Sequence, residues 1–106
     1  MDDVVIIEGA RTAFGALNGG LKGVTATELG VVAGREALRR SHVSPEDIDH
    51  VIFGNVVHTC KDAAYLARHI GLALGVRTEV PGLVVNRLCA SGLEAAVVGA
   101  QQLLLG

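Results

Sequence analysis

Large aromatic side chains are nearly missing from this sequence. There is no tryptophan, and one tyrosine and two phenylalanines make up the aromatic content of 106 residues. Half of the residues are nevertheless apolar. Any core must therefore be built from Val, Leu, Ile and Ala, whose small side chains allow helices to pack closely on a sheet. This length favours one domain with a core of modest size over two domains.

Cysteine, long apolar runs and a basic leader are also scarce. The two cysteines, Cys60 and Cys89, are too few for a disulfide framework, and neither belongs to a CxxC pair. In a reducing compartment both remain thiols. No stretch approaches the roughly 20 uninterrupted apolar residues of a membrane span, and two aspartates follow Met1 where a secretory signal carries positive charge. We therefore expect a cytoplasmic protein without a membrane span.

Neither sign of charge dominates, and the motifs of several binding classes are missing. The net charge of −2 gives no basis for binding nucleic acid. The scattered glycines do not form G-x-G-x-x-G, which excludes a dinucleotide site on spacing. His58, Cys60 and His69 carry metal-ligating atoms but lack a carboxylate at typical spacing, so we expect no metal site. Lys61 and Arg68 are expected on a solvated helix face rather than in a phosphate-binding site.

Short apolar runs alternate with helix-start signals along the chain. Thr25 and Glu28 fit an S/T-x-x-E capping box, which predicts the start of a helix. Ser44 followed by proline predicts a single helical turn, and Asp62 is a candidate N-cap. The predicted strands are 4–7, 50–57 and 83–88, and the predicted helices begin at Thr25, Asp62 and Ser91 and end near Arg40, Gly75 and Leu105.

The order β-α-β-α-β-α predicts an α/β fold with a parallel sheet and helices on both faces. Residues 91–105 contain Glu94 as their only charge, so we expect this helix to be buried nearly all round. Three strands and two other helices cannot supply that cover, and the sequence stops at Gly106, directly after the helix. We infer that the chain is a segment of a larger domain, or that a partner completes it.

The stretch "NRLCASGLEA" places Cys89 where a predicted strand hands over to a helix. The first amides of a helix have no intrahelical acceptor and carry about half a positive charge together with the macrodipole. Such an end stabilises a thiolate, the nucleophilic form of cysteine. Position alone leaves two interpretations open, because free cysteine is also among the most buried residue types.

The chain contains the stretches "ARTAFG", "HVIFGNVV", "AAYLARHIGLALGV" and "VPGLVVNRLCASGLEAA". These four stretches resemble the thiolase family, in the same order and at similar spacing. The block around Cys89 is the specific one, and the match covers essentially all 106 residues. "NRLC" and "YLARH" resemble the 3-ketoacyl-CoA thiolases of fatty-acid or aromatic degradation more than the acetoacetyl-CoA enzymes.

The resemblance implies a fold, a nucleophile and a substrate. It implies a five-layered α-β-α-β-α fold made of two similar halves, of which residues 1–106 are the opening portion of the first. It implies that Cys89 takes an acyl group from 3-ketoacyl-CoA as a thioester, that a second CoA cleaves this thioester, and that the Cys89 amide helps to form the oxyanion hole. The reverse direction is a Claisen condensation. CoA enters as a substrate, not a prosthetic group, and the complete protein is expected to be a homodimer or homotetramer.

The chain also departs from the family pattern. The family's base histidine in a GHP motif, its second cysteine in a CxGG motif and its asparagine-bearing oxyanion motif are all missing. The isolated segment is therefore expected to be inactive. Two alternatives stay open: a non-catalytic association module or truncated product, and a ketoacyl-synthase-like condensing enzyme.

Overall fold

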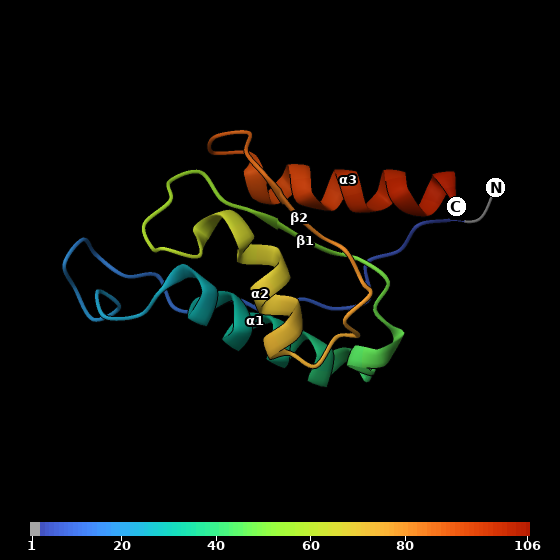
Figure 1. The fold of residues 1–106 in the computed structure, drawn as a ribbon, viewed down its shortest axis with the longest axis horizontal. Coiled ribbons are helices and arrows are strands. Elements are labelled where there is room, and N and C mark those ends of the chain that lie inside the picture. The colour runs from blue at the N-terminus through green and yellow to red at the C-terminus, as the bar shows by residue number, and fades with distance from the viewer. Residues whose placement is uncertain (1–2) are drawn as a thin grey trace.

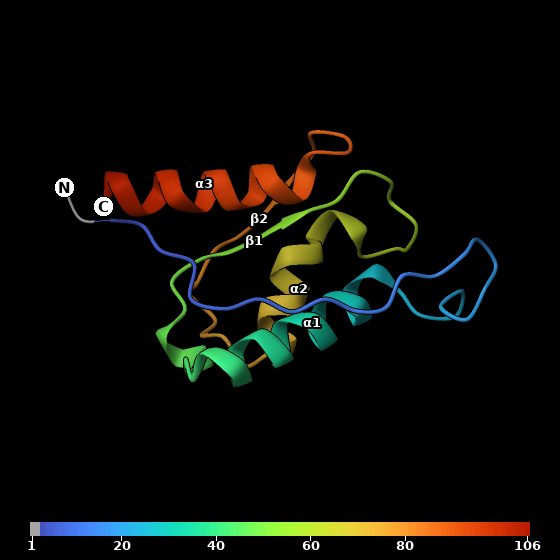
Figure 2. The ribbon, with the colours of Figure 1, turned by 180° about the vertical axis from the view of Figure 1, so that it is seen from behind.

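The computed structural model describes residues 3–106 and contains three layers (Figure 1). Helix α3 lies on one face of a two-stranded sheet, helix α2 lies on the other face, and helix α1 packs against α2. The same arrangement is visible from behind in Figure 2. The elements are α1 (Ala26–Ser41), β1 (Val51–Gly54), α2 (Leu66–Ala73), β2 (Gly82–Val85) and α3 (Ser91–Leu105), with short 3-10 turns at Pro45–Asp47 and Ala63–Tyr65.

Strands β1 and β2 pair in parallel. Val51 lies opposite Gly82, and Gly54 lies opposite Val85. Because the strands are parallel, their carboxyl ends meet at one edge of the sheet. The loop 55–62 and the turn 86–90 both leave from this edge, which therefore collects the chemistry-bearing residues that the sequence singled out.

Local signals predicted two of the helices closely. The capping box is confirmed: the Glu28 amide donates to the Thr25 hydroxyl at 3.1 Å, and the Thr25 amide donates to the Glu28 carboxylate at 2.7 Å. The single turn after Ser44 is confirmed as well. Helix α3 has the predicted bounds. Helix α2 begins later than predicted, after a 3-10 turn, and the Asp62 side chain does not cap that turn.

The predicted strand 4–7 is wrong for this structure. Residues 4–7 form no strand, and Ile6 is 87% exposed. A strand exists only through hydrogen bonds to a neighbour, and among residues 3–106 the only pairing partner that β1 finds is β2. The β-branched residues 4–7 therefore have the propensity for a strand but lack the interstrand hydrogen bonds that would form one.

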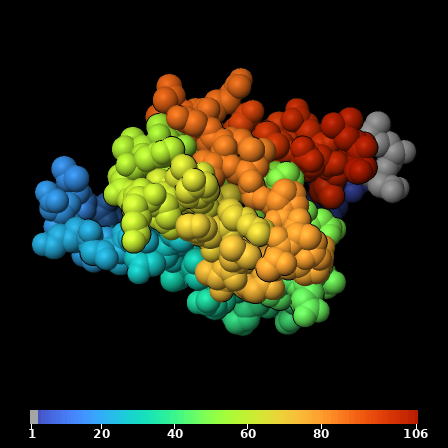
Figure 3. Space-filling view, viewed as in Figure 1, coloured from blue at the N-terminus to red at the C-terminus, as the bar shows by residue number. Residues whose placement is uncertain are grey.

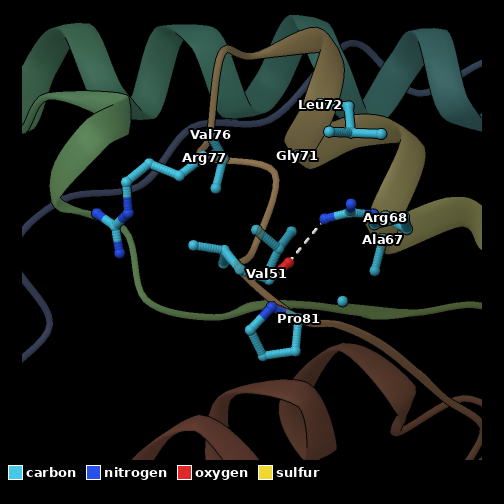
Figure 4. A pocket seen from close by; sticks show the side chains of 10 residues that line it. Val51, Ala67, Arg68, Gly71, Leu72, Val76, Arg77 and Pro81 are labelled. Atoms are coloured by element: carbon cyan, nitrogen blue, oxygen red, sulfur yellow. Dashed lines mark hydrogen bonds between the residues drawn. The ribbon is translucent and has the colours of Figure 1, made fainter.

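The core of the described chain is small and centres on α2. Ile70 is fully buried there, and Gly30 of α1 has no side chain to clash with it, so the two helices approach closely. Arg68 donates to the Val80 carbonyl at 2.8 Å (Figure 4) and to the Thr78 carbonyl at 2.6 Å. The expectation that Arg68 lies on a solvated face is therefore wrong. The buried apolar residues are Ala63, Leu66, Ala67, Ile70, Val76 and Val80.

Helix α3 is far more exposed than predicted. Only Ser91 of this helix is buried, and Leu105 is 86% exposed; Figure 3 shows the red side chains of α3 at the molecular surface. The helix has one layer to pack on, so its other sides stay uncovered. By length and composition alone, the window Leu88–Leu105, with a mean hydropathy of 1.4, also suffices to cross a membrane, which the sequence analysis did not expect. An uncovered core helix has the same composition.

Candidate active site

Cys89 lies in a tight turn between β2 and α3. The turn covers residues 86–90, Ala90 is the N-cap of α3, and the first helical residue is Ser91. The Cys89 side chain is exposed. The turn projects at the carboxyl end of the sheet, as the orange loop of Figure 1 shows. The cysteine is therefore accessible at the amino end of a helix, and the interpretation as a sealed structural cysteine is wrong for this structure.

Three backbone amides at this end of α3 are free of protein acceptors. The Ser91 amide donates to the Leu88 carbonyl at 3.1 Å, and the Glu94 amide donates to the Ala90 carbonyl at 2.9 Å. Within residues 3–106, the amides of Cys89, Gly92 and Leu93 find no such acceptor. Unpaired amides at a helix start attract anions. They are suited to a thiolate or to the oxyanion of a thioester under attack.

Leu88 holds an unusual backbone conformation directly before the cysteine. Its φ of 49° lies in the left-handed region, which is rare for a residue with a bulky side chain. Its amide donates to the Asn86 side-chain oxygen at 3.0 Å, and its carbonyl accepts from the Ser91 hydroxyl at 2.6 Å. Strained residues of this kind gather at functional sites when the surroundings fix them.

Ser91 connects the turn to the sheet. Its hydroxyl also accepts the Arg87 amide at 2.8 Å, and the residue is only 5% exposed. Beneath it, a side chain at Gly54 would place a Cβ 2.5 Å from the Ser91 carbonyl carbon. The end of β1 is thus pressed against the start of α3. The site residues predicted from the sequence did not include Asn86, Leu88, Ser91 or Gly54; the one available signal was a serine at a predicted helix start.

One ion pair crosses the turn. The Arg87 guanidinium lies 3.6 Å from the Glu94 carboxylate, with both side chains partly exposed. Glu94 is in the first turn of α3, where a negative charge suits the macrodipole. The cationic Arg87 balances this carboxylate beside the site.

The second cysteine has a different environment. The Cys60 thiol donates to the Asp62 carboxylate at 3.0 Å. This hydrogen bond and partial burial raise the pKa of Cys60, so its thiol stays protonated more firmly than that of an ordinary cysteine. The two cysteines therefore differ in kind: Cys89 is exposed at a helix start, and Cys60 is bound to a carboxylate.

Asp62 joins three segments at the same edge of the sheet. Besides Cys60, it accepts hydrogen bonds from the Thr27 hydroxyl of α1 at 3.0 Å and from His69 Nδ1 of α2 at 2.9 Å. The hydrogen bonds from Cys60, His69 and Thr27 hold the pKa of Asp62 well below its usual range. The Tyr65 ring stacks on His69, with centroids 5.7 Å apart. Asp62 therefore fixes the loop 55–62 to both helices.

These side chains do not form a metal centre. Cys60 and His69 meet at Asp62, but residues 3–106 contain no group of three or more His, Cys, Asp or Glu side chains arranged to hold an ion. The donors are used in hydrogen bonds to one carboxylate instead.

Comparison with known proteins identifies relatives over nearly the whole chain. The family model described as "Thiolase, N-terminal domain" matches residues 4–106. The chain is 48% identical over 100 residues to the mitochondrial 3-ketoacyl-CoA thiolase of Homo sapiens, covering 94% of this chain and 25% of that protein. It is 41% identical to an acetyl-CoA acetyltransferase of Clostridioides difficile, covering 90% of this chain and 88% of that protein.

Solved structures show the same fold. The crystal structure of human mitochondrial 3-ketoacyl-CoA thiolase in complex with CoA matches with a TM-score of 0.92 and 47% identity, over 93% of this chain and 25% of that chain. The predicted α/β architecture, the opening portion of the thiolase fold, is confirmed. The chain spans about a quarter of the length of the human enzyme.

Proposed function

Because the chain belongs to the thiolase family, we propose that it is the nucleophile-bearing segment of an enzyme that transfers acyl groups between acyl-CoA and CoA. Its relatives are named as 3-ketoacyl-CoA thiolases and acetyl-CoA acetyltransferases. The single observation that carries the proposal is the exposed Cys89 at the amino end of α3, beside free backbone amides.

The proposed reaction consists of two nucleophilic attacks, the first by Cys89 on a 3-ketoacyl-CoA and the second by CoA on the acyl-enzyme. The Cys89 thiolate attacks the 3-keto carbon, the bond between carbons 2 and 3 breaks, and its electron pair leaves with a proton as acetyl-CoA. The acyl group stays on the sulfur as a thioester. A CoA thiolate then attacks this thioester, releases acyl-CoA and restores the Cys89 thiolate. The free amides stabilise the oxyanion that forms at each attack.

The segment supplies the nucleophile and part of an oxyanion hole. We propose that residues 1–106 form an incomplete N-terminal domain. The base and the acid that move the protons would then come from sequence outside these 106 residues. CoA is the proposed second substrate, and the CoA complex of the human relative supports this choice. Its 3-ketoacyl-CoA thiolase name supports 3-ketoacyl-CoA as the first substrate and a place in fatty-acid β-oxidation.

A second candidate is a non-catalytic association module. The uncovered apolar sides of α3 favour it, because such a surface binds a partner or a second copy. The relative from Clostridioides difficile, which this chain covers over 88% of its length, has a comparably short sequence and is nevertheless named as an acetyltransferase. We place the enzyme first.

Assembly and location are also proposals. The complete protein is proposed to be a homodimer or homotetramer, and its two free thiols suit a reducing compartment such as the cytoplasm. Gel filtration with light scattering tests the first proposal, and cell fractionation tests the second.

The activity is tested by thiolysis of a 3-ketoacyl-CoA with the complete gene product, its Cys89→Ser variant and the isolated 106-residue chain. We expect the complete protein to be active and Cys89→Ser to lower kcat by at least about 10³-fold. The isolated chain should be inactive. Full activity of Cys89→Ser would overturn the assignment, and an active monomeric 106-residue chain would overturn the claim that proton transfer needs groups outside it.

A further inference from the structure

The backbone before Cys89 is held from both sides. Leu88 adopts φ 49°, and each polar group of its main chain has a side-chain partner. The amide donates to Asn86 Oδ1 at 3.0 Å, and the carbonyl accepts from Ser91 Oγ at 2.6 Å. A leucine rarely takes this conformation unaided, so the hydrogen bonds to the two side chains stabilise a conformation that leucine itself does not favour.

Ser91 is buried and hydrogen-bonded on both sides, whereas Cys89 is exposed. The Ser91 hydroxyl acts at once as donor to Leu88 and as acceptor of the Arg87 amide at 2.8 Å. The residue is buried and its backbone rests on Gly54. The hydroxyl therefore holds the peptide between Asn86 and Arg87 and the peptide between Leu88 and Cys89, from a buried position that solvent does not reach.

From this geometry we infer that Ser91 and Asn86 are positioning residues that orient Cys89 toward the carbonyl carbon it attacks, by holding Leu88 in the left-handed conformation. The inference rests on the proposed function, in which Cys89 is the nucleophile. If Leu88 relaxed to a right-handed or extended conformation, the chain direction at Cys89 would change. Cys89 would then be displaced relative to the start of α3, and small misplacements of reacting groups cost large factors in rate.

A purely structural role for Ser91, as one more hydrogen bond at a helix start, makes a different prediction. Loss of that bond would lower stability, and no change at Leu88 would restore activity. Glycine adopts the left-handed region without support. We call the two hydrogen bonds that hold Leu88 in the left-handed conformation, from its amide to Asn86 and from Ser91 to its carbonyl, the clamp. Leu88→Gly should allow the left-handed conformation without the clamp, but it does not restore the hydrogen bonds of Ser91.

The experiment uses the complete protein with Ser91→Ala, Leu88→Gly and the double variant. Thiolysis kinetics, melting temperature and the rate of Cys89 alkylation by iodoacetamide are measured for each. We expect Ser91→Ala to lower kcat by about tenfold or more with little change in KM, and to slow alkylation of Cys89. The double variant should recover kcat to within about threefold of Leu88→Gly while its melting temperature stays low.

Asn86 provides the second arm, because it is exposed and its substitution spares the buried core. Asn86→Ala should act in the same direction as Ser91→Ala, and Asn86→Asp, which keeps the acceptor oxygen, should restore the rate. A Ser91→Ala variant as fast as the parent, or a folded double variant that is no faster than Ser91→Ala alone, would overturn the inference.

The two proposals fail separately. If the parent protein shows no Cys89-dependent thiolysis, the proposed function falls, and the alkylation rates of Cys89 still test the clamp. If thiolysis depends on Cys89 but neither kcat nor the alkylation rate changes in Ser91→Ala and Asn86→Ala, only the positioning role of these two residues is refuted.

Discussion

Gly54 and Ser91 are in backbone contact at the point where β1 ends beneath the start of α3. A Cβ added at Gly54 would lie 2.5 Å from the carbonyl carbon of Ser91 and 2.6 Å from its oxygen. Real Cβ atoms do not approach backbone this closely, so any side chain at Gly54 must displace the first turn of α3. The sheet thereby sets the height of the turn that carries Cys89.

This contact predicts a loss of activity from the smallest possible substitution. Gly54→Ala should push α3 outwards and lower thiolysis kcat by about tenfold or more, because the turn moves with the helix. Gly99→Ala is the matched control. Gly99 lies on α3, and a Cβ added there would meet only the Ile52 side chain, at 3.8 Å, which is an ordinary contact. Equal activity of the two variants would contradict the proposed coupling between β1 and the turn.

The two cysteines should react at different rates. Asp62 raises the pKa of Cys60, so at neutral pH a smaller fraction of Cys60 is thiolate than in an ordinary cysteine. We expect iodoacetamide to label Cys89 first, as followed by peptide mass spectrometry. Asp62→Asn should speed the labelling of Cys60, because it removes the charge that opposes ionisation. Asp47→Asn, a change at an exposed carboxylate of a 3-10 turn, should leave both rates unchanged; faster labelling of Cys60 than of Cys89 in the parent would contradict this assignment.

Acid should destabilise the fold through specific carboxylates. Glu36 accepts hydrogen bonds from Arg39 and Arg40, which lower its pKa from 4.5 to about 2, and the hydrogen bonds at Asp62 lower the pKa of that carboxyl from 3.8. Because the folded pKa lies below the unfolded one, the stabilisation is complete above the unfolded pKa and is lost as the pH falls through the folded value. The window for Glu36 is therefore about pH 4.5 down to about 2.

Melting temperature measured against pH tests this account. Glu36→Gln should flatten the decline between about pH 4.5 and 2, and Asp62→Asn should lower the melting temperature at neutral pH and flatten its decline in acid. Glu46→Gln serves as the control, since the Glu46 carboxylate makes no ion pair within residues 3–106. If melting temperature falls with pH in the same way for Glu36→Gln and the parent, the Glu36 carboxylate does not contribute to the pH dependence of stability.

Local chemistry made parts of the fold predictable. Thr25 and Glu28 satisfy each other's backbone amides within one turn, and the small-residue run from Ser91 makes a helix on its own pattern. The position of Cys89 at a helix start follows from the same signal. These features depend on residues three or four apart, so a single sequence contains what determines them.

Features that depend on distant surfaces were not predictable. Residues 4–7 have strand propensity, yet a strand needs a free neighbouring edge, and α3 has a core composition without a second layer to bury it. The left-handed Leu88 is held by two hydrogen bonds, one that its amide donates to Asn86 and one that its carbonyl accepts from Ser91, which no propensity scale contains. Asp62 was expected to cap α2, but donors from two helices and a loop take its carboxylate instead.

Trapping of the acyl-enzyme shows whether Cys89 carries the acyl group. The complete protein is mixed with 3-ketoacyl-CoA without free CoA, quenched in acid and digested, and the mass of the peptide containing Cys89 is measured. We expect the acyl mass on that peptide in the parent and in Cys60→Ser, and none in Cys89→Ser. An unmodified Cys89 peptide in a protein that turns over substrate, or an acyl group on Cys60 instead, would contradict it.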